Sequence, residues 1–550
     1  MLQTTIKNFT QNPKNDLLSG LTVALALVPE AVAFAFVAGV DPLVGLYGAF
    51  IMGIVTALFG GRPGMISGAT GAMAVVMVHL IQKGNAVGAA LEVPVENLGL
   101  QWLFITLFFV GGIQILAGLL RLGKFVRLIP HPVMMGFVNG LAIVIFLSQL
   151  TLFPNAVPQD ISLWESPGAW LNALFSNGTF WTMMGLIFLT MGIMFGLPKL
   201  TKKVPSALIA ILVVAGITIF GGMDVSTVGS FIQEGGGNGL QGGLPSFQQQ
   251  VFTLFHTIEG HFVSTILPTA FILAAVGLIE SLMTLNLIDE MTETRGSGNR
   301  ECVAQGGANI LNGLFGGMGG CAMIGQSIIN VSSGGRGRLS GATAAIALLC
   351  FVLFGAPLIE QIPIAALVGV MFMVVVGTFA WSSFRILNKI PKSDAFVLIT
   401  VSAITVWQDL AVAVIAGVIM SALTFAWKSA TMIRARKSIK EDGTKVYEIW
   451  GPLFFGSTTA FNKKFDIRND PQHVEIDFIE SKVSDHSGVE ALRNVANKYL
   501  EQGKQVTLTH LSPDCKTLLI KWNPEFETII RDSIDDPRYY VVTDLLDSEV

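Results

Sequence analysis

Two carboxylates lie deep inside apolar stretches of the chain. Glu30 is within VALALVPEAVAFAF, and Glu280 is within LAAVGLIESLMTLNLI. A charged carboxylate at membrane depth costs about 3 kcal/mol on insertion scales, so it normally faces a cavity or a partner. Thr284 follows Glu280 by four residues and shares its helix face. A carboxylate with a hydroxyl suits a sodium ion, and a carboxylate whose charged form burial disfavours suits a proton. The alternative is a neutral Glu bonded between packed helices, which we weigh more heavily for Glu30.

A second kind of chemistry is indicated by two related phrases about 256 residues apart. Residues 58–73 read LFGGRPGMISGATGAM, and residues 314–329 read LFGGMGGCAMIGQSII. Each is a Gly-broken extended stretch followed by a short apolar segment. Free N–H groups at the starts of two such interrupted helices hold an anion, whereas the glycines alone also permit close helix packing. The predicted anion-binding residues open the two segments and comprise Ser67, Gly68, Ala69, Thr70, Gly71, Gly325, Gln326 and Ser327.

These side chains need a membrane domain to position them. The chain has 550 residues, of which 52% are hydrophobic and 13% are charged. Soluble domains carry about 25% charged residues. Charge is scarce over residues 17–430 and frequent beyond them. We therefore predict a cytoplasmic segment over 1–16, a transmembrane domain over 17–430, a linker over 431–437 and a cytoplasmic domain over 438–550. The net charge of −4 indicates no nucleic-acid partner.

Fourteen membrane segments are expected, seven in each half of the transmembrane domain. They lie near residues 17–37, 43–60, 69–82, 99–119, 132–152, 180–197, 204–222, 264–288, 301–316, 325–333, 341–356, 364–380, 393–408 and 410–427. With both termini inside, Arg and Lys gather in the inside loops, and Lys83 is almost alone outside. Two halves of seven spans have opposite orientation, so the predicted fold is an α-helical polytopic membrane protein built as an inverted repeat.

Several motifs resemble the sulfate permease (SulP) family. They are PEAVAFAFVAGVDPLVGLYGA (29–49), HPVMMGFVNGLAI (131–143), GNRECVAQGGANILNGLFGG (298–317) and SIINVSSGGRGRLSG (327–341). The resemblance implies fourteen segments divided into a core and a gate, an anion site between the third and tenth segments, and a homodimer. Many eukaryotic members have Gln where Glu30 stands, and vertebrate members often have Arg where Gln326 stands. Glu280 and Thr284 resemble the sodium site of cyanobacterial bicarbonate transporters, and Thr70 matches a Thr that contacts bicarbonate in them.

The C-terminal region reads as a small α/β domain. We predict a strand that leads into a short loop over 446–456, a strand over 473–480, a helix over 488–504, and a further strand over QVTLTHL. It resembles the STAS domain that closes SulP transporters and is shared with bacterial anti-sigma-factor antagonists. Those antagonists are phosphorylated on Ser in an Asp-Ser-Ser-Gly motif, and Ser487 lies in Asp-His-Ser-Gly here. Ser487 is a candidate phosphosite or a helix cap, and we favour the cap.

The sequence indicates a secondary-active transporter of a small inorganic oxyanion in the inner (plasma) membrane. Bicarbonate is slightly favoured over sulfate, and Glu280 with Thr284, together with Glu30, is predicted to bind the coupled sodium or proton. Alternatives are a proton-coupled carrier of sulfate, dicarboxylates or nucleobases on the same fold, and an uncoupled channel or exchanger. No enzyme activity is predicted, no cofactor other than a sodium ion, and no metal site beyond that ion. An unknown partner of the STAS domain is expected.

Overall fold

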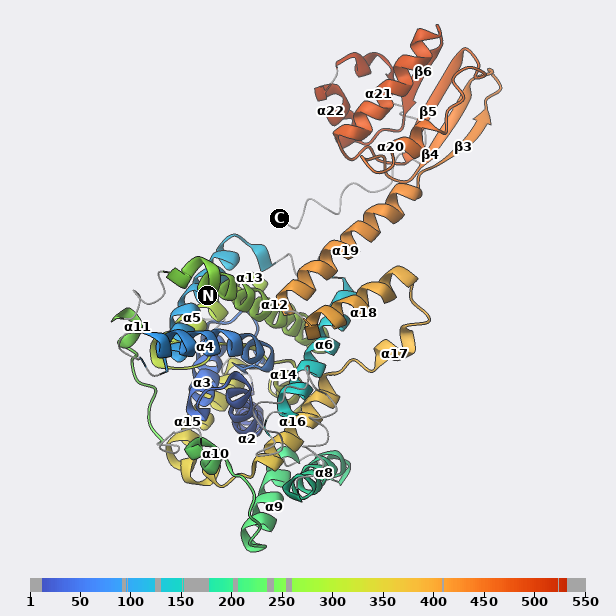
Figure 1. Cartoon of the computed structure of the whole chain (residues 1–550). Coiled ribbons are helices and arrows are strands. Elements are labelled where there is room, and N and C mark those ends of the chain that lie inside the picture. Colours follow the sequence, from blue (N-terminus) through green and yellow to red (C-terminus); the bar gives the residue numbers. More distant parts are fainter. Residues whose placement is uncertain are drawn as a thin grey trace. The chain divides into compact units, whose positions relative to one another are not determined.

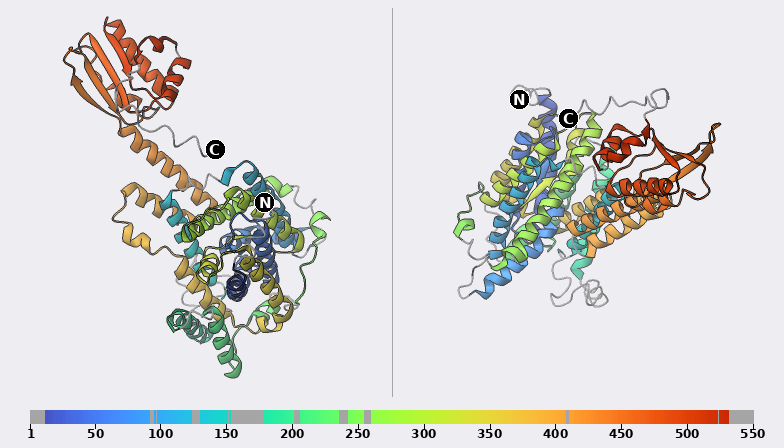
Figure 2. Two further views of the ribbon diagram at one scale, coloured as in Figure 1. Left: turned by 180° about the vertical axis from the view of Figure 1, so that it is seen from behind. Right: turned by 90° about the horizontal axis from the view of Figure 1, so that it is seen from above.

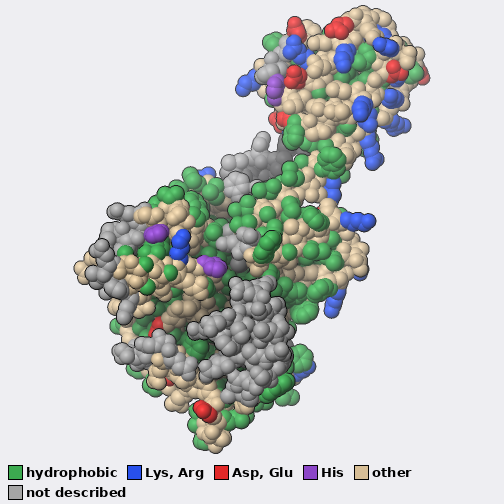
Figure 3. Space-filling model, viewed as in Figure 1, with side chains coloured by type: hydrophobic (Ala, Val, Ile, Leu, Met, Phe, Trp, Pro, Cys, Tyr) green, Lys and Arg blue, Asp and Glu red, His purple; other side chains and the backbone are tan. Residues whose placement is uncertain are grey.

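The computed structural model describes most of the chain. The described residues are 12–91, 95, 97–123, 130–150, 152, 178–200, 206–234, 242–253, 260–407, 410–522 and 524–531. They form two compact units, Met1–Val418 and Ile419–Val550. On the face shown in Figure 3, Lys, Arg, Asp and Glu gather on the C-terminal unit, whereas hydrophobic side chains cover much of the helical unit. This difference follows the charge distribution along the sequence.

Every one of the fourteen expected segments corresponds to a described helix (Figure 1). The helices of the first half are α2 (Pro13–Ala38), α3 (Pro42–Phe59), α4 (Gly71–Ala90), α5 (Leu98–Leu119), α6 (His131–Leu150), α8 (Gly178–Leu200) and α9 (Ser206–Phe220). Those of the second half are α12 (Leu267–Thr292), α13 (Gly298–Phe315), α14 (Ile324–Ser332), α15 (Arg338–Glu360), α16 (Ile364–Thr378), α18 (Lys392–Trp407) and α19 (Leu410–Thr431). Among the described helices, eight candidate spans are long and apolar enough to cross a membrane.

Short elements connect these helices. They are α10 (Val228–Glu234), α11 (Gln250–Thr253), the π-helical turn η3 (Phe262–Ile266) and α17 (Ser382–Ile386). Two three-residue strands, β1 (Ser67–Ala69) and β2 (Gly320–Ala322), pair antiparallel and precede α4 and α14. The two related phrases of the sequence therefore meet at their extended stretches.

The helices pack in two groups, each drawn from both halves of the chain. In the core group, α13 lies along α5, α15 lies along α2, and α3 contacts both α13 and α15. In the gate group, α6 lies along α18, and α16 contacts α6 and α8. In Figure 2 the blue helices of the first half and the green to yellow helices of the second half are mixed in this group, so the two halves do not form separate bundles. The division into a core and a gate agrees with the architecture that the family resemblance implies.

Close approach of α5 and α13 depends on two facing glycines. A Cβ atom on Gly111 would lie 2.3 Å from the Gly306 carbonyl oxygen, and one on Gly306 would lie 2.5 Å from that of Gly111. Small residues at a membrane helix interface let backbones touch, which replaces the hydrophobic driving force that lipid cannot supply. This contact positions α13 next to the paired strands β1 and β2. We call this strand pair (residues 67–69 and 320–322), together with the helix starts that follow it, the crossing.

The C-terminal unit is a five-stranded sheet with helices on one face (Figure 2). Its elements are β3 (Arg434–Ile439), β4 (Lys445–Trp450), α20 (Thr458–Asn462), β5 (His473–Glu480), α21 (His486–Glu501), β6 (Gln505–Thr509), α22 (Pro513–Trp522), the 3₁₀ turn η4 (Pro524–Thr528) and β7 (Ile530–Arg531). The strand order is β3-β4-β5-β6-β7, with β3 antiparallel to β4 and the other pairs parallel. The region predicted as a linker over 431–437 contains the start of β3. The sequence RARKSI does not indicate a strand, because an edge strand carries charge and shows little apolar alternation.

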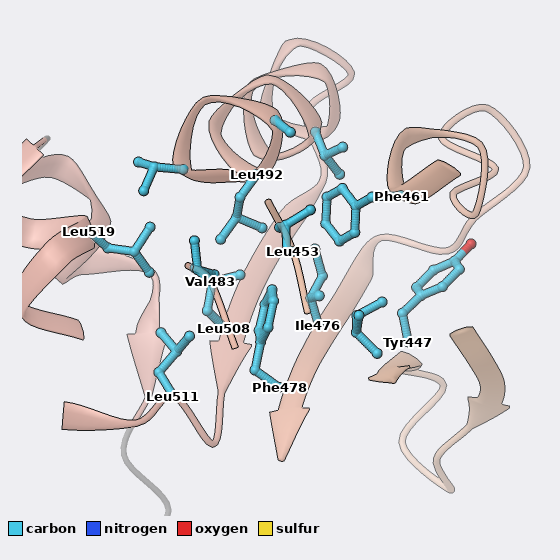
Figure 4. Close-up of a cluster of buried hydrophobic side chains, with 14 of the residues drawn as sticks. Tyr447, Leu453, Phe461, Ile476, Phe478, Val483, Leu492, Leu508, Leu511 and Leu519 are labelled. Carbon is cyan, nitrogen blue, oxygen red and sulfur yellow. The ribbon is translucent and has the colours of Figure 1, made fainter. Parts of the chain in front are cut away.

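The core of this unit lies between the sheet and its helices, as Figure 4 shows. Ile476 and Phe478 on β5 and Leu508 on β6 pack beneath Leu492 on α21, and all four are at most 1% exposed. Burying a side chain of this size contributes about 1.5–3 kcal/mol relative to leaving it exposed. This sheet and its helix fit the α/β domain predicted from the strand and helix patterns.

A buried polar cluster closes one end of this core. Asp470 is 5% exposed and accepts hydrogen bonds from Tyr447, at 2.7 Å, and from Tyr499, while also pairing with Lys445. Burial alone would raise the pKa of Asp470. The hydrogen bonds from Lys445, Tyr499 and Tyr447 outweigh burial and hold this pKa below its ordinary value. The ionised carboxylate therefore stabilises the fold.

Asp485, rather than Ser487, caps α21. The Asp485 carboxylate accepts from the Gly488 N–H at 2.8 Å and from the Phe455 N–H at 2.8 Å. Ser487 is the second residue of the helix and is half-buried. The cap role that the sequence favoured for Ser487 is thus wrong, because the residue two positions earlier has the extended backbone that a cap requires.

Candidate functional site

The crossing of β1 and β2 brings the starts of two helices together. Ser67 pairs with Ala322, Gly68 with Cys321, and Ala69 with Gly320. The first bonds inside the helices are Ala74 N–H to Thr70 O, at 2.9 Å, and Ser327 N–H to Met323 O, at 3.0 Å. The amides of residues 71–73 and 324–326 therefore have no acceptor within their own helices. Two helix N-termini, each equivalent to about half a positive charge, start from one small sheet.

The two predicted glycines at these helix starts have different surroundings. A Cβ atom on Gly71 would lie 2.7 Å from Phe34 Cε1 and 3.0 Å from Ile145 Cδ1. A Cβ atom on Gly325 would have no atom within 4 Å. Gly71 is thus required for packing against α2 and α6, whereas Gly325 faces open space at the start of α14.

The predicted hydroxyl donors, Ser67, Thr70 and Ser327, also differ from one another in their contacts. Ser67 Oγ accepts from Gln305 Nε2 at 2.9 Å, and Ser327 Oγ accepts from the Ile66 N–H at 3.0 Å. These two hydroxyls hold the strands in position. Thr70 is 2% exposed, and its Oγ1 lies 3.2 Å from Cys321 Sγ. The Thr70 side chain thus contacts a side chain of β2 directly before α4 begins.

Glu280 and Thr284 both lie against the second strand. Cys321 Sγ donates to Glu280 Oε2 at 3.0 Å. Thr284 Oγ1 donates to the Glu280 carbonyl at 2.8 Å and lies 3.5 Å from the Ala322 carbonyl. Because its single proton is directed to a backbone oxygen, the Thr284 hydroxyl keeps lone pairs for a cation. Carboxylate, hydroxyl and carbonyl oxygens are the kinds of ligand that hard cations prefer, and the sodium site predicted at Glu280 and Thr284 stays a prediction.

Glu30 reaches the same interrupted segment from α2. Its Oε2 accepts a hydrogen bond from the side-chain amide of Gln326, the third residue of α14. Glu30 and Gln326 are 7% and 5% exposed. The structure thus brings both predicted coupling carboxylates to one segment, residues 320–327, with Glu280 at the strand and Glu30 at the helix.

A ladder of polar side chains on α13, which the sequence analysis did not single out, supports the crossing. Glu301 accepts from the Gly61 N–H at 2.7 Å, and Gln305 donates to Glu301 Oε1 at 2.7 Å. Asn309 Oδ1 accepts from the Gly320 N–H at 3.0 Å, and Asn309 Nδ2 donates to the Gly320 carbonyl at 3.1 Å. The i, i+4 spacing of these three residues inside a membrane segment was the available signal.

Asn312 is fully buried on the same helix but differs from Asn309. Among the described residues, neither of its side-chain polar atoms has a hydrogen-bond partner, although the residue is 0% exposed. Asn309 and Asn312 are thus two buried amides that allow a comparison, since only Asn309 is hydrogen-bonded to the crossing.

The basic residues nearest to the crossing in sequence serve other elements. Arg62 pairs with Asp289 at 3.2 Å, and Arg338 donates to the carbonyls of Ala57, at 2.8 Å, and Gly60, at 2.6 Å. Within the described part of the chain, no Lys or Arg side chain is hydrogen-bonded to residues 67–71 or 320–327. The helix N-termini are thus the positive groups that the described residues place directly at the crossing.

Several named proteins are similar to the chain in sequence. It is 40% identical over 510 residues to the putative sulfate transporter YbaR of Bacillus subtilis, covering 92% of this chain and 96% of that protein. It is 31% identical over 546 residues to the bicarbonate transporter BicA of Synechocystis sp., covering 94% and 92%. These relatives are membrane transporters and not enzymes.

Solved structures of transporters are also similar to the chain. The transmembrane domain of a cyanobacterium bicarbonate transporter BicA matches with a TM-score of 0.62 at 33% identity, covering 74% of this chain and 98% of that one. Murine Solute Carrier 26 family member A9 in the inward-facing state matches with a TM-score of 0.78 at 16% identity, covering 97% and 93%, and shares the fold. Residues 14–401 match the sulfate permease family and residues 436–536 match the STAS domain. The chain therefore belongs to the sulfate permease family and ends in a STAS domain.

Proposed function

We propose that the chain is a secondary-active transporter of a small inorganic oxyanion, driven by sodium or protons that bind at Glu280. The observation that carries this proposal is the hydrogen bond between Glu280 and Cys321. Cys321 belongs to the strand pair from which both interrupted helices start, so a cation at Glu280 would lie beside an anion at the helix N-termini. Occupation of one site then favours the other by direct electrostatic attraction.

Bicarbonate is the substrate that the charges favour. The described residues at the crossing provide two helix N-termini, together equivalent to about one positive charge, and no hydrogen-bonded Lys or Arg. One coupled cation neutralises Glu280. When Glu30 is also uncharged, through a proton of its own, the helix ends are left to balance a singly charged anion. The oxygen ligands at Glu280 and Thr284 also fit sodium, as in the resemblance to bicarbonate transporters.

Sulfate is the second candidate, and one observation favours it. YbaR, which shares 40% identity with this chain, is named as a putative sulfate transporter. A doubly charged anion in this site requires more compensation than the helix ends supply. We therefore expect sulfate transport to need one more coupled proton or sodium ion than bicarbonate transport.

The test is uptake of labelled bicarbonate and labelled sulfate into proteoliposomes. Each anion is supplied with an inward sodium gradient, an inward proton gradient or neither, using the wild type and Glu280→Gln. The glutamine keeps the size of the side chain and removes its charge. Thr284→Val provides a second variant, because it removes the hydroxyl that completes the proposed sodium site.

Each outcome has a definite meaning. Sodium-driven bicarbonate uptake that Glu280→Gln abolishes supports the proposal in full. Proton-driven sulfate uptake that the same variant abolishes keeps the coupling role and replaces the substrate. Equal flux under all gradients, unchanged by the mutation, would identify an uncoupled channel or exchanger and refute the role of Glu280.

We further propose that the core helices move against the gate helices during transport, in an elevator-like or rocking motion. The protein would act as a homodimer in the inner (plasma) membrane with both termini in the cytoplasm. Labelling of single cysteines introduced near residues 83 and 295 from either side of the membrane tests the orientation. Cross-linking in native membranes tests the dimer.

A further inference from the structure

Cys321 lies between the proposed anion and cation sites. It is the central residue of β2 and is fully buried. Its Sγ is 3.2 Å from Thr70 Oγ1 and 3.0 Å from Glu280 Oε2. Within the described part of the chain, no other side chain has hydrogen bonds to both of these residues. A single thiol thus connects the start of the first interrupted helix with the carboxylate on α12.

Counting hydrogens shows what this connection does. A thiol carries one proton, a hydroxyl carries one, and an ionised carboxylate carries none. With Glu280 ionised, the Cys321 S–H donates to Glu280 Oε2. The Thr70 O–H then donates to Cys321 Sγ, since the sulfur has no second hydrogen to offer. In this arrangement Thr70 has no proton left for an anion.

A cation at Glu280 reverses the chain of donors. A sodium ion on Glu280 Oε2 removes the acceptor of the thiol, and a proton on Glu280 turns the carboxyl into a donor toward the sulfur. In both cases the Cys321 S–H turns to Thr70 Oγ1, and the Thr70 O–H is free to donate to an anion. Every hydrogen of the thiol and the hydroxyl stays on its own atom and only rotates.

We propose that Cys321 is the positioning residue that couples cation binding at Glu280 to anion binding at Thr70. This inference rests on the proposed function and adds how one site senses the other. The groups facing Glu280 are Cys321 from β2 and, through the thiol, Thr70 before α4; Glu30 on α2 contacts Gln326 instead. No described Lys, Arg or His is hydrogen-bonded to Glu280, so no fixed cation replaces the coupled ion.

The test measures the apparent KM for the transported anion in proteoliposomes as a function of the coupled cation. Four proteins are compared: wild type, Cys321→Ser, Cys321→Ala and the control Cys302→Ala. The serine preserves one donor and one acceptor at this place, and the alanine removes both. Cys302 is also buried but lies on α13 with no described hydrogen bond to Thr70 or Glu280.

Wild type and Cys302→Ala should show an anion KM that falls about fivefold or more as the cation is raised to saturation. Cys321→Ser should keep most of this change. Cys321→Ala should still transport but show at most about half of the wild-type fold-change, because only the direct electrostatic attraction between the two sites remains. A Cys321→Ala protein with the wild-type change in KM would overturn the inference and leave the proposed function intact. A wild-type KM that does not respond to any cation would instead refute the proposed coupling itself.

A variant that fails to fold does not end the test. Thr70→Val removes the hydroxyl that contacts the Cys321 thiol and should also reduce the cation dependence of KM, whereas Thr70→Ser should retain it. Size-exclusion profiles of the detergent-solubilised proteins identify misfolded variants. A full cation dependence in both Thr70→Val and Cys321→Ala would refute the connection through the thiol.

Discussion

A single methyl group added at Gly71 and, separately, at Gly325 distinguishes packing from anion binding at the two helix starts. Both glycines open an interrupted helix, and the sequence gives no reason to treat them differently. In the structure, the new Cβ at Gly71 would meet Phe34 and Ile145, whereas at Gly325 it would enter open space. We expect Gly71→Ala to impair folding stability and Gly325→Ala to impair transport.

The magnitudes follow from the distances. Carbon atoms pack at about 3.5 Å or more, so the 2.7 Å contact at Gly71 requires Phe34 to shift by roughly 0.8 Å. Overpacking of this kind costs about 1–3 kcal/mol. At Gly325 no atom must move, and alanine is the better helix former by up to about 1 kcal/mol. The methyl group there would instead keep an anion away from the free amides, which we expect to raise its KM about tenfold, or about 1.4 kcal/mol.

Thermal unfolding in detergent, followed by fluorescence-detected size exclusion, measures the first effect, and initial uptake rates in proteoliposomes measure the second. Gly71→Ala should unfold at lower temperature than the wild type. Gly325→Ala should unfold at or above the wild-type temperature but with the raised KM. Wild-type KM values in Gly325→Ala would show that the space beside α14 is not where the anion binds, and the assignment of the site would be wrong.

Three further predictions concern the supports of the two units. Asn309→Ala should lower the free energy of unfolding by about 1–3 kcal/mol, because it removes the partner of the buried Gly320 N–H and carbonyl groups. Asn312→Ala should lower it by less, and thermal unfolding compares the two variants. The pKa of Asp470 is lowered in the folded state, so its stabilisation is present above the unfolded pKa and is lost as the pH falls through the folded value. Acid titration of a fragment over residues 432–550, followed by circular dichroism, should therefore show unfolding below about pH 4, and Asp470→Asn should weaken that pH dependence. Asp485→Ala should destabilise the same fragment by about 0.5–2 kcal/mol in urea, and Ser487→Ala should leave its unfolding midpoint unchanged.

The positions of the membrane segments could be predicted because hydropathy and loop charge are local properties. Each segment of the sequence needs only its own composition to be recognised, and the related phrases identify the two interrupted helices. The i, i+4 spacing of Glu280 and Thr284 likewise predicts a shared face. The structure agrees, since the Glu280 side chain contacts Cys321 and the Thr284 side chain contacts the Ala322 carbonyl, both on β2.

The contacts that give the site its chemistry could not be predicted in this way. Gly68 and Cys321 are opposite each other only because two three-residue strands pair in one register, across about 250 residues of chain. A shift of that register by one residue would turn the Cys321 side chain to the other face of the strand. The polar ladder of Glu301, Gln305 and Asn309 was missed for a related reason. Its residues stabilise partners that are distant in sequence, so the helix looks like an imperfect membrane span until those partners are known.

The arrangement of charges explains why coupling to a cation should follow from this fold. The helix N-termini at the crossing together equal about one positive charge. Glu280 and Glu30 both contact the segment 320–327, so two ionised carboxylates would more than cancel it. An anion alone would then enter a site with net negative charge and low dielectric, where repulsion is strong. Adding a cation or a proton at the carboxylates restores the balance. We therefore expect anion binding to require a bound cation or proton, and replacing Glu280 by Gln to permit anion binding without one.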